Sequence, residues 1–258
     1  MLSKPHLVLS PQEESDLSSV RGSLCSRETF GTVDGPGIRY IFFLQGCLYR
    51  CLYCHNPDSV ACRGGELWTA GQVLEETLRY KNYIRSGGVT FSGGEPLMQA
   101  EFVEACTRLL HSRGIHVAVD TAGVPLTDAA ASAVNNADML LLDIKAIDDE
   151  MCRRLTGQTN RYSLEMLDYC EKIGKPVWLR QVLLRGYTLD DAQLNLLAQH
   201  LSKYSCIDRV ELLPFHKLGE PKWEGLDRSY TLADVEATTR EEADAARELL
   251  RSYGLKVQ

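Results

Sequence analysis

The feature that most constrains the fold is a repeated alternation of short apolar runs with amphipathic helical patterns, from about residue 40 onward. Six runs are continuous in apolar residues and rich in β-branched or aromatic types, as is typical of strands buried on both faces of a parallel sheet. They cover residues 40–45, 88–92, 115–121, 138–145, 177–184 and 209–215. Because helical patterns separate the runs, we expect one α/β domain, an open or closed barrel with right-handed crossovers.

The helical segments between these runs carry start and stop signals. Thr69, with Gln72 three residues later, is a capping-box signal for a helix whose apolar positions extend to Ile84. Gly114 is the expected left-handed end of the next helix. Further helices are expected over residues 128–137, 161–173, 189–204 and 232–253.

Composition excludes several classes of protein. The 258 residues are 44% hydrophobic and 24% charged, which argues against collagen-like, coiled-coil and broadly disordered chains. The net charge of −7 lacks the basic field that nucleic acid or anionic lipid would need. No apolar run reaches the length of a membrane span, so the default expectation is a cytoplasmic protein, and nothing suggests more than a monomer. Residues 1–22 show no sustained period and are expected to form a loose leader ahead of a core domain over 23–258.

Three of the nine cysteines, Cys47, Cys51 and Cys54, lie within eight residues just after the first run. In a reducing cytosol this crowding indicates a metal site rather than disulfides. Three thiolates can hold three irons of a [4Fe–4S] cluster, which ordinarily takes four, and leave one iron open to a substrate. The alternative is structural zinc, with His55 or a distant cysteine as fourth ligand, although no second cysteine pair of the usual kind exists. The six other cysteines are interpreted as small buried hydrophobes.

Polar residues collect just after the predicted strands, where parallel α/β folds build their active sites. They are Ser92, Gly93, Gly94, Glu95, Asp120, Thr121, Asp143, Lys145 and His216, with Arg180 inside the fifth strand. Paired glycines let the backbone approach a ligand, and the adjacent carboxylate can accept from an ammonium group. Considered by itself, the Gly-Gly-Glu sequence would be explained by an ordinary βα turn. A satisfied core ion pair is the alternative for Arg180, and an ordinary loop histidine the alternative for His216.

The spacing Cys-x3-Cys-x2-Cys after the first strand, with Gly-Gly-Glu after the second, resembles the radical S-adenosylmethionine superfamily. In that superfamily the open iron binds the amino and carboxylate groups of the methionine moiety. Electron transfer then cleaves the sulfonium and yields a 5′-deoxyadenosyl radical. The fold that this resemblance implies is a partial (β/α)6 barrel, which agrees with the six expected strands.

A narrower resemblance covers about residues 24–225 and points to the glycyl-radical-enzyme activases. It rests on GTVDGPGIR at 31–39 and CLYCHN at 51–56, and it ends at Lys222-Trp223. The interval before Gly-Gly-Glu holds only Cys62, so the ferredoxin-like insert of several other activases is absent, and the ribonucleotide reductase activases are much shorter. Both comparisons favour the branch that acts on pyruvate formate-lyase.

The activity implied by this resemblance is that of an oxidoreductase that removes a hydrogen atom from a glycine in a loop of the partner enzyme. A flavodoxin or ferredoxin would supply the electron. Two alternatives within enzymes are an activase of another glycyl radical enzyme and a radical enzyme acting on a small molecule. An alternative from another class is a zinc-stabilised binding module without chemistry.

The resemblance also implies roles for individual residues. The implied cluster ligands are Cys47, Cys51 and Cys54, and the implied holders of the methionine amino end are Gly93, Gly94 and Glu95. A monovalent cation is implied at Asp120, Thr121, Asp143 and the carbonyl of Leu141. Further cofactor contacts are implied at Lys145, Arg180 and His216, and a contact with the substrate peptide at Asp34.

Overall fold

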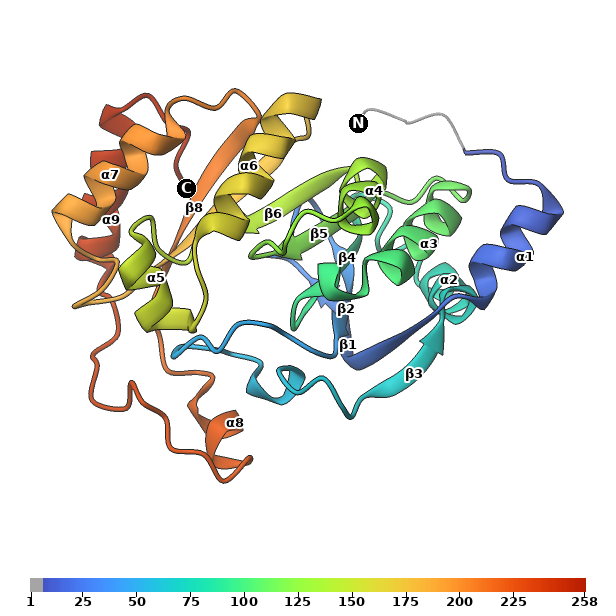
Figure 1. Ribbon diagram of the computed structural model, residues 1–258, viewed down its shortest axis with the longest axis horizontal. Helices are drawn as coiled ribbons and strands as arrows, with labels where there is room; N and C mark the ends of the chain where they lie inside the picture. The colour runs from blue at the N-terminus through green and yellow to red at the C-terminus, as the bar shows by residue number, and fades with distance from the viewer. Residues whose placement is uncertain (1–6) are drawn as a thin grey trace.

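The computed structural model of the protein describes residues 7–258, which form one eight-stranded sheet with helices packed around it (Figure 1). The strands are β1 (Arg21–Gly31), β2 (Arg39–Leu44), β3 (Glu66–Thr69), β4 (Gly88–Gly93), β5 (Val117–Thr121), β6 (Met139–Asp143), β7 (Val177–Leu183) and β8 (Ile207–Pro214). Their order in the sheet is β3-β1-β2-β4-β5-β6-β7-β8. From β2 to β8 all neighbours are parallel, whereas β1 and β3 are antiparallel additions at one edge. The six parallel strands confirm the predicted partial barrel, and the sheet stays open.

The helices mostly begin and end where the sequence signals predicted. They are α1 (Pro11–Ser19), α2 (Ala70–Arg79), α3 (Ala100–His111), α4 (Asp128–Asn136), α5 (Asp149–Thr156), α6 (Arg161–Ile173), α7 (Asp191–Leu201), α8 (Glu220–Glu224) and α9 (Arg240–Ser252), with 3-10 turns η1 (Pro57–Ser59) and η2 (Pro96–Gln99). Thr69 forms the predicted capping box with Gln72, and Gly114 has the predicted positive φ, 69°. The last helix begins later than predicted, because Thr239 caps it in a box with Glu242. Helix α2 ends earlier than predicted, at Arg79, so Ile84 lies in the turns that follow it. Among residues 7–258, no helix is long and apolar enough to cross a membrane.

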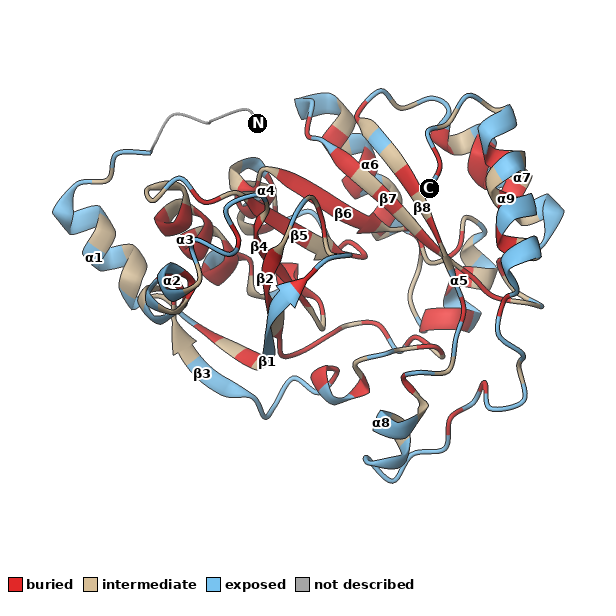
Figure 2. Cartoon of the chain, turned by 180° about the vertical axis from the view of Figure 1, so that it is seen from behind, coloured by how far each residue is buried: buried red, intermediate tan, exposed pale blue. Residues whose placement is uncertain are grey.

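The core lies between the sheet and its outer helices, and it divides the strands into two kinds. In β2, β4, β5 and β6 nearly every residue is buried, as predicted (Figure 2). In β7 and β8 burial alternates instead: Leu179 is buried, whereas Trp178 and Arg180 are half-buried. The prediction of two buried faces is therefore wrong for these two strands, because one of their faces lines a cavity.

The N-terminal segment differs from the loose leader that composition suggested. Residues 1–6 lie outside the described part of the chain, and residues 11–19 form α1, which starts with a capping box between Ser10 and Glu13. The helix packs against α2 and α3, with Glu13 3.5 Å from Arg108 and Glu14 2.5 Å from Arg113. No residue of α1 is buried, so it has no apolar period for sequence analysis to detect. The capping box and the packing of the half-buried Leu17, with Leu9 and Val20 beside the helix, against the core order it instead.

Candidate active site

A cavity of about 1100 Å³ lies at the carboxyl ends of the parallel strands. Every site residue predicted from the sequence lines it except Leu141, so the fold gathers positions from Asp34 to His216. Leu141 lies deeper on the same face of β6 as Asp143 and is fully buried in a small apolar cluster with Ala118. The Leu141 side chain therefore forms part of the layer beneath the cavity.

The loop after β2 carries the three cysteines along one wall of the cavity. Cys47 and Cys51 are each 9% exposed, and Cys54 is more accessible. Burial raises the pKa of Cys47 to about 12 and also raises the pKa values of Cys51 and Cys54. These thiols therefore need a positively charged metal centre to become thiolate ligands. Among the described residues, no three Cys, His, Asp or Glu side chains are placed to share a single metal ion.

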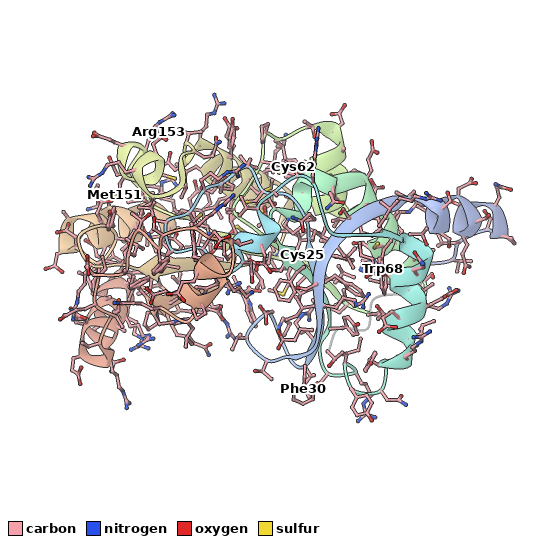
Figure 3. The ribbon with its side chains drawn as sticks, turned by 90° about the horizontal axis from the view of Figure 1, so that it is seen from below. Cys25, Phe30, Cys62, Trp68, Met151 and Arg153 are labelled. Carbon is pink, nitrogen blue, oxygen red and sulfur yellow. The ribbon has the colours of Figure 1, made fainter. Side chains whose placement is uncertain are left out.

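The end of α5 holds the cysteine loop in place through its backbone. The N–H of Arg50 donates to the carbonyl of Thr156 at 2.7 Å, and the N–H of Leu52 donates to that of Leu155 at 2.9 Å. The last carbonyls of a helix lack partners within it, so the loop satisfies them. Figure 3 labels Met151 and Arg153 on this helix. Sequence analysis missed α5, although its signals were present in the N-cap Asp148 and the left-handed Gly157.

The Gly-Gly-Glu turn after β4 packs directly on the cysteine loop. A Cβ atom on Gly94 would lie 2.1 Å from the carbonyl oxygen of Gly46, and Gly93 has a φ of 103°. The N–H of Glu95 donates to that same Gly46 carbonyl at 2.8 Å. In this structure the glycines thus let two loops of the site approach each other, besides leaving backbone exposed to the cavity.

The carboxyl group of Glu95 lies at the base of this turn and is 1% exposed. It accepts hydrogen bonds from the Thr121 hydroxyl at 2.7 Å, the Ala122 N–H at 2.9 Å and the Leu97 N–H at 3.1 Å. Burial raises the pKa of Glu95 to about 7, because these three donors only partly offset desolvation. A positively charged group in the cavity would therefore be needed to ionise Glu95 fully near neutral pH.

Asp120 and Arg180 form a half-buried ion pair, and some of its buried atoms lack a hydrogen-bond partner among the described residues. Asp120 accepts from the Ser92 hydroxyl at 2.7 Å, and its Oδ1 lies 3.2 Å from Nη1 of Arg180. Glu211 is the second carboxylate beside Arg180, at 3.9 Å. Among the described residues, Oδ1 of Asp120 and both Nε and Nη1 of Arg180 are buried without a hydrogen-bond partner. Since such atoms cost free energy, the ion pair alone does not account for Arg180, and these atoms fit a polar ligand in the cavity.

Lys145 keeps a positive charge at the same rim. Its Nζ lies 2.9 Å from Oδ2 of Asp143 and 5.9 Å from the ring centre of Tyr53. Burial acts to lower the pKa of Lys145, but Asp143, together with Tyr53 and Cys51, raises it well above the usual value. Tyr53 was not predicted as a site residue, because an aromatic residue between cysteines gives no signal of its own.

Two predicted residues face the cavity from loops. Burial raises the pKa of Asp34 to about 6, Asp120 adds to this effect, and Arg180 opposes it. The carbonyl of Asp34 accepts from the Thr90 hydroxyl at 2.6 Å, which fixes its loop to β4. His216 stacks on His55 with ring centres 4.5 Å apart, and both residues line the cavity.

The six remaining cysteines behave mostly as predicted. Cys106, Cys152, Cys170 and Cys206 are buried. Cys62 is exposed, contrary to that interpretation, because the loop before β3 runs over the surface, and Cys25 on β1 is half-buried (Figure 3).

Comparison with protein families identifies the class. Residues 41–196 match the family model described as Radical SAM superfamily, a span that includes the cysteine loop and the strand ends from β4 to β7. Among solved structures, a radical SAM methyltransferase from Sphaerobacter thermophilus has a TM-score of 0.62 at 17% identity, covering 85% of this chain and 65% of that chain. This second likeness supports the fold alone.

Relatives with higher sequence identity show which group within the radical SAM superfamily the chain resembles. The chain is 38% identical over 246 residues to the pyruvate formate-lyase 1-activating enzyme of Escherichia coli K12, covering 93% of this chain and 99% of the relative. It is 41% identical over 237 residues to the pyruvate formate-lyase-activating enzyme of Staphylococcus aureus USA300, covering 88% and 94%. A domain of such an enzyme from Bacteroides vulgatus has a TM-score of 0.56 at 25% identity, covering 67% of this chain and 98% of that domain. The chain therefore belongs to the pyruvate formate-lyase-activating enzymes of the radical SAM superfamily.

This membership brings a [4Fe–4S] cluster and S-adenosylmethionine as cofactors, and it overturns the zinc-module interpretation. The cavity fits both groups. Its three thiols come from one loop, and the unpartnered atoms of Asp120 and Arg180 lie across from them. Gly94 supplies exposed backbone where a side chain would not fit.

Proposed function

We propose that the protein activates a pyruvate formate-lyase by removing a hydrogen atom from one glycine of that partner. The observation that carries the proposal is the gathering of the cysteine loop, the Gly-Gly-Glu turn and a charged wall around one cavity, in a chain 38–41% identical to enzymes of this name. The bound cofactors supply the radical chemistry by reductive cleavage of S-adenosylmethionine at the cluster.

The cluster would be held by Cys47, Cys51 and Cys54, with its open iron toward the cavity. The backbone bonds from the loop to the end of α5 keep the three thiols on one wall. The same packing of α5 and the Gly-Gly-Glu turn against the loop buries Cys47 and Cys51, which would limit the access of water to a bound cluster.

S-adenosylmethionine would lie between the cluster and the strand ends. Glu95, with the backbone of Gly93 and Gly94, would accept from the ammonium group, which would also stabilise the ionised form of Glu95. Lys145, Arg180 and His216 would contact the remaining polar groups. Lys145 and His216 follow the ends of β6 and β8, Arg180 lies within β7, and all three line the cavity.

A monovalent cation would bind beside the cofactor carboxylate. Asp120, Thr121 and Asp143 offer oxygen atoms to it at adjacent ends of β5 and β6. Leu141 would contribute only its carbonyl, since its side chain lies beneath the cavity.

The partner glycine would enter from the open side of the sheet, where Asp34 faces the cavity. A flavodoxin or ferredoxin would reduce the cluster, and the activase would act as a monomer. A different glycyl radical enzyme as partner, or a small molecule as substrate, is the second candidate. This second candidate would give every site residue the same role, except for Asp34.

The test is anaerobic electron paramagnetic resonance of the reconstituted, reduced protein mixed with S-adenosylmethionine and pyruvate formate-lyase. We expect a carbon-centred doublet that disappears when the partner glycine is replaced by alanine. No doublet, with a cluster signal that still shifts on addition of S-adenosylmethionine, would reject this partner and favour the second candidate.

A further inference from the structure

The least buried of the three site cysteines lies beneath a segment from the far end of the chain. Cys54 is more accessible than Cys47 and Cys51. Residues 217–225, which we call the strap, lie shortly after β8, include α8 and pack against the η1 turn just after Cys54. The strap accounts for neither the fold of the sheet nor the charged wall of the cavity.

The strap contacts the cysteine loop at several successive residues. The indole Nε1 of Trp223 donates to the carbonyl of Cys54 at 2.8 Å. Nζ of Lys222 donates to Oδ1 of Asn56 at 2.9 Å and lies 3.9 Å from Asp58. These bonds join positions more than 160 residues apart and fix the backbone immediately after the third cysteine.

Gly219 shows how closely the strap approaches. Its φ is −82°, which any residue adopts, so backbone conformation does not require glycine there. A Cβ at this position would lie 2.8 Å from the His55 ring, 3.0 Å from the His55 Cα and 3.2 Å from the Cys54 carbonyl. Gly225 at the other end of the strap has a φ of −63°, and its Cβ would meet only ordinary contacts at 3.4 Å and beyond. Close approach therefore matters at Gly219 and not at Gly225.

The strap also completes the apolar surroundings of the cysteines. Cys47 and Cys51 belong to a buried apolar cluster that includes Phe215 and Tyr230, which flank the strap. Trp223 packs against this cluster, with its ring 5.8 Å from that of Tyr230. The strap thus packs against the same apolar cluster that contains Cys47 and Cys51.

We propose that the strap is a positioning element that closes the cluster site at Cys54, with Trp223 as its principal positioning residue. By fixing the Cys54 carbonyl and covering the loop, it limits the access of water and oxygen to the cluster. The proposal rests on the cluster ligands of the proposed function, and it assigns Trp223 no contact with substrate.

The test compares Gly219→Ala and Trp223→Phe with two matched controls, Gly225→Ala and Trp68→Phe. Trp68 lies on β3, away from the cavity lining (Figure 3). All four proteins are reconstituted anaerobically, their iron content and melting temperature are measured, and loss of cluster absorbance is then followed in air. Iron content under anaerobic conditions reports the ligand assignment separately from the strap.

We expect all four variants to fold and to take up iron anaerobically, as the wild type does. In air, Trp223→Phe should lose the cluster about fivefold faster, the factor that corresponds to one neutral hydrogen bond. Gly219→Ala should also lose it faster than the wild type, because its Cβ would displace the strap from His55 and Cys54. The controls should follow the wild type. Wild-type rates for both strap variants would overturn the proposal while leaving the proposed function intact. If Trp223→Phe does not fold, Gly219→Ala decides alone.

Discussion

Charged side chains at the two ends of the parallel strands differ in how fully the protein satisfies their hydrogen bonds. At the amino ends, Asp138 accepts from the His111 ring at 2.8 Å and from the Val117 N–H at 2.7 Å, and Lys175 donates to the carbonyls of Asn135 and Ala137. At the carboxyl ends, Asp120 and Arg180 keep buried atoms without a hydrogen-bond partner among the described residues.

At the amino ends the charged side chains bond to the protein itself and stabilise the fold. At the carboxyl ends part of their hydrogen-bonding capacity remains available to a ligand. The bonds of Asp138 and Lys175 join neighbouring elements and can be satisfied by the protein alone. The pair at Asp120 and Arg180 faces a cavity, so its remaining hydrogen-bonding capacity is directed at whatever fills that cavity. Three predictions sharpen this comparison or break it.

The largest effect is expected from Cys51→Ala. Removing one of three thiolates from the cysteine loop should abolish cluster binding and activity, because no other described cysteine lines the cavity beside Cys47 and Cys54. Iron and sulfide content after anaerobic reconstitution measures this. Cys62→Ala, at an exposed position, is the control and should load normally. Undiminished iron in Cys51→Ala would refute the ligand assignment.

Two smaller effects of different kinds are expected at the two strand ends, one on cofactor affinity and one on stability. Asp120→Asn should weaken S-adenosylmethionine binding about tenfold, equivalent to about 1.4 kcal/mol, because it removes the charge opposite Arg180. Asp138→Asn should instead lower the free energy of unfolding by about 1–3 kcal/mol and leave cofactor affinity unchanged. Anaerobic titration calorimetry and thermal melts of both variants measure this. If both variants lost S-adenosylmethionine affinity equally, the proposed difference between the carboxyl and amino ends of the strands would be wrong.

A third effect concerns the pH dependence of stability. Burial raises the pKa of Glu95 from 4.5 to about 7, so between these values the folded protein holds a proton that the unfolded chain has released. The Glu95 contribution to stability is therefore fully present below about pH 4.5 and is lost as pH rises toward 7. Glu95→Gln should flatten this decline in melts of the cofactor-free protein from pH 5 to 8. A slope equal to that of the wild type would contradict the raised pKa.

Much of the fold could be predicted because its signals are local. The parallel strands are continuous apolar runs, and capping residues such as Thr69 mark helix starts. By contrast, β1 and β3 lack such runs: most of β1 and half of β3 are exposed, and both depend on pairing across the sheet. Helix α1 depends on packing against α2 and α3, where Leu17 meets the core, and no local pattern reveals these contacts.

The residues of the candidate site also fall into two groups, those that could be predicted from the sequence and those that could not. Residues at strand ends, such as Asp120 and Lys145, could be predicted because parallel strands bring their carboxyl ends together. Trp178 and Glu211 could not, because their part in the cavity follows from β7 and β8 having one open face. The contact of Trp223 with Cys54 joins distant segments and is visible only in three dimensions.

The most direct measurement of the central claim is electron paramagnetic resonance of the reduced, anaerobically reconstituted protein, with and without S-adenosylmethionine. If the cavity at the carboxyl ends holds both cofactors, the cluster signal should change shape when S-adenosylmethionine is added. The change should be weaker in Asp120→Asn and unaltered in Asp138→Asn. A cluster signal indifferent to S-adenosylmethionine, or a protein that takes up zinc and no iron, would contradict the account.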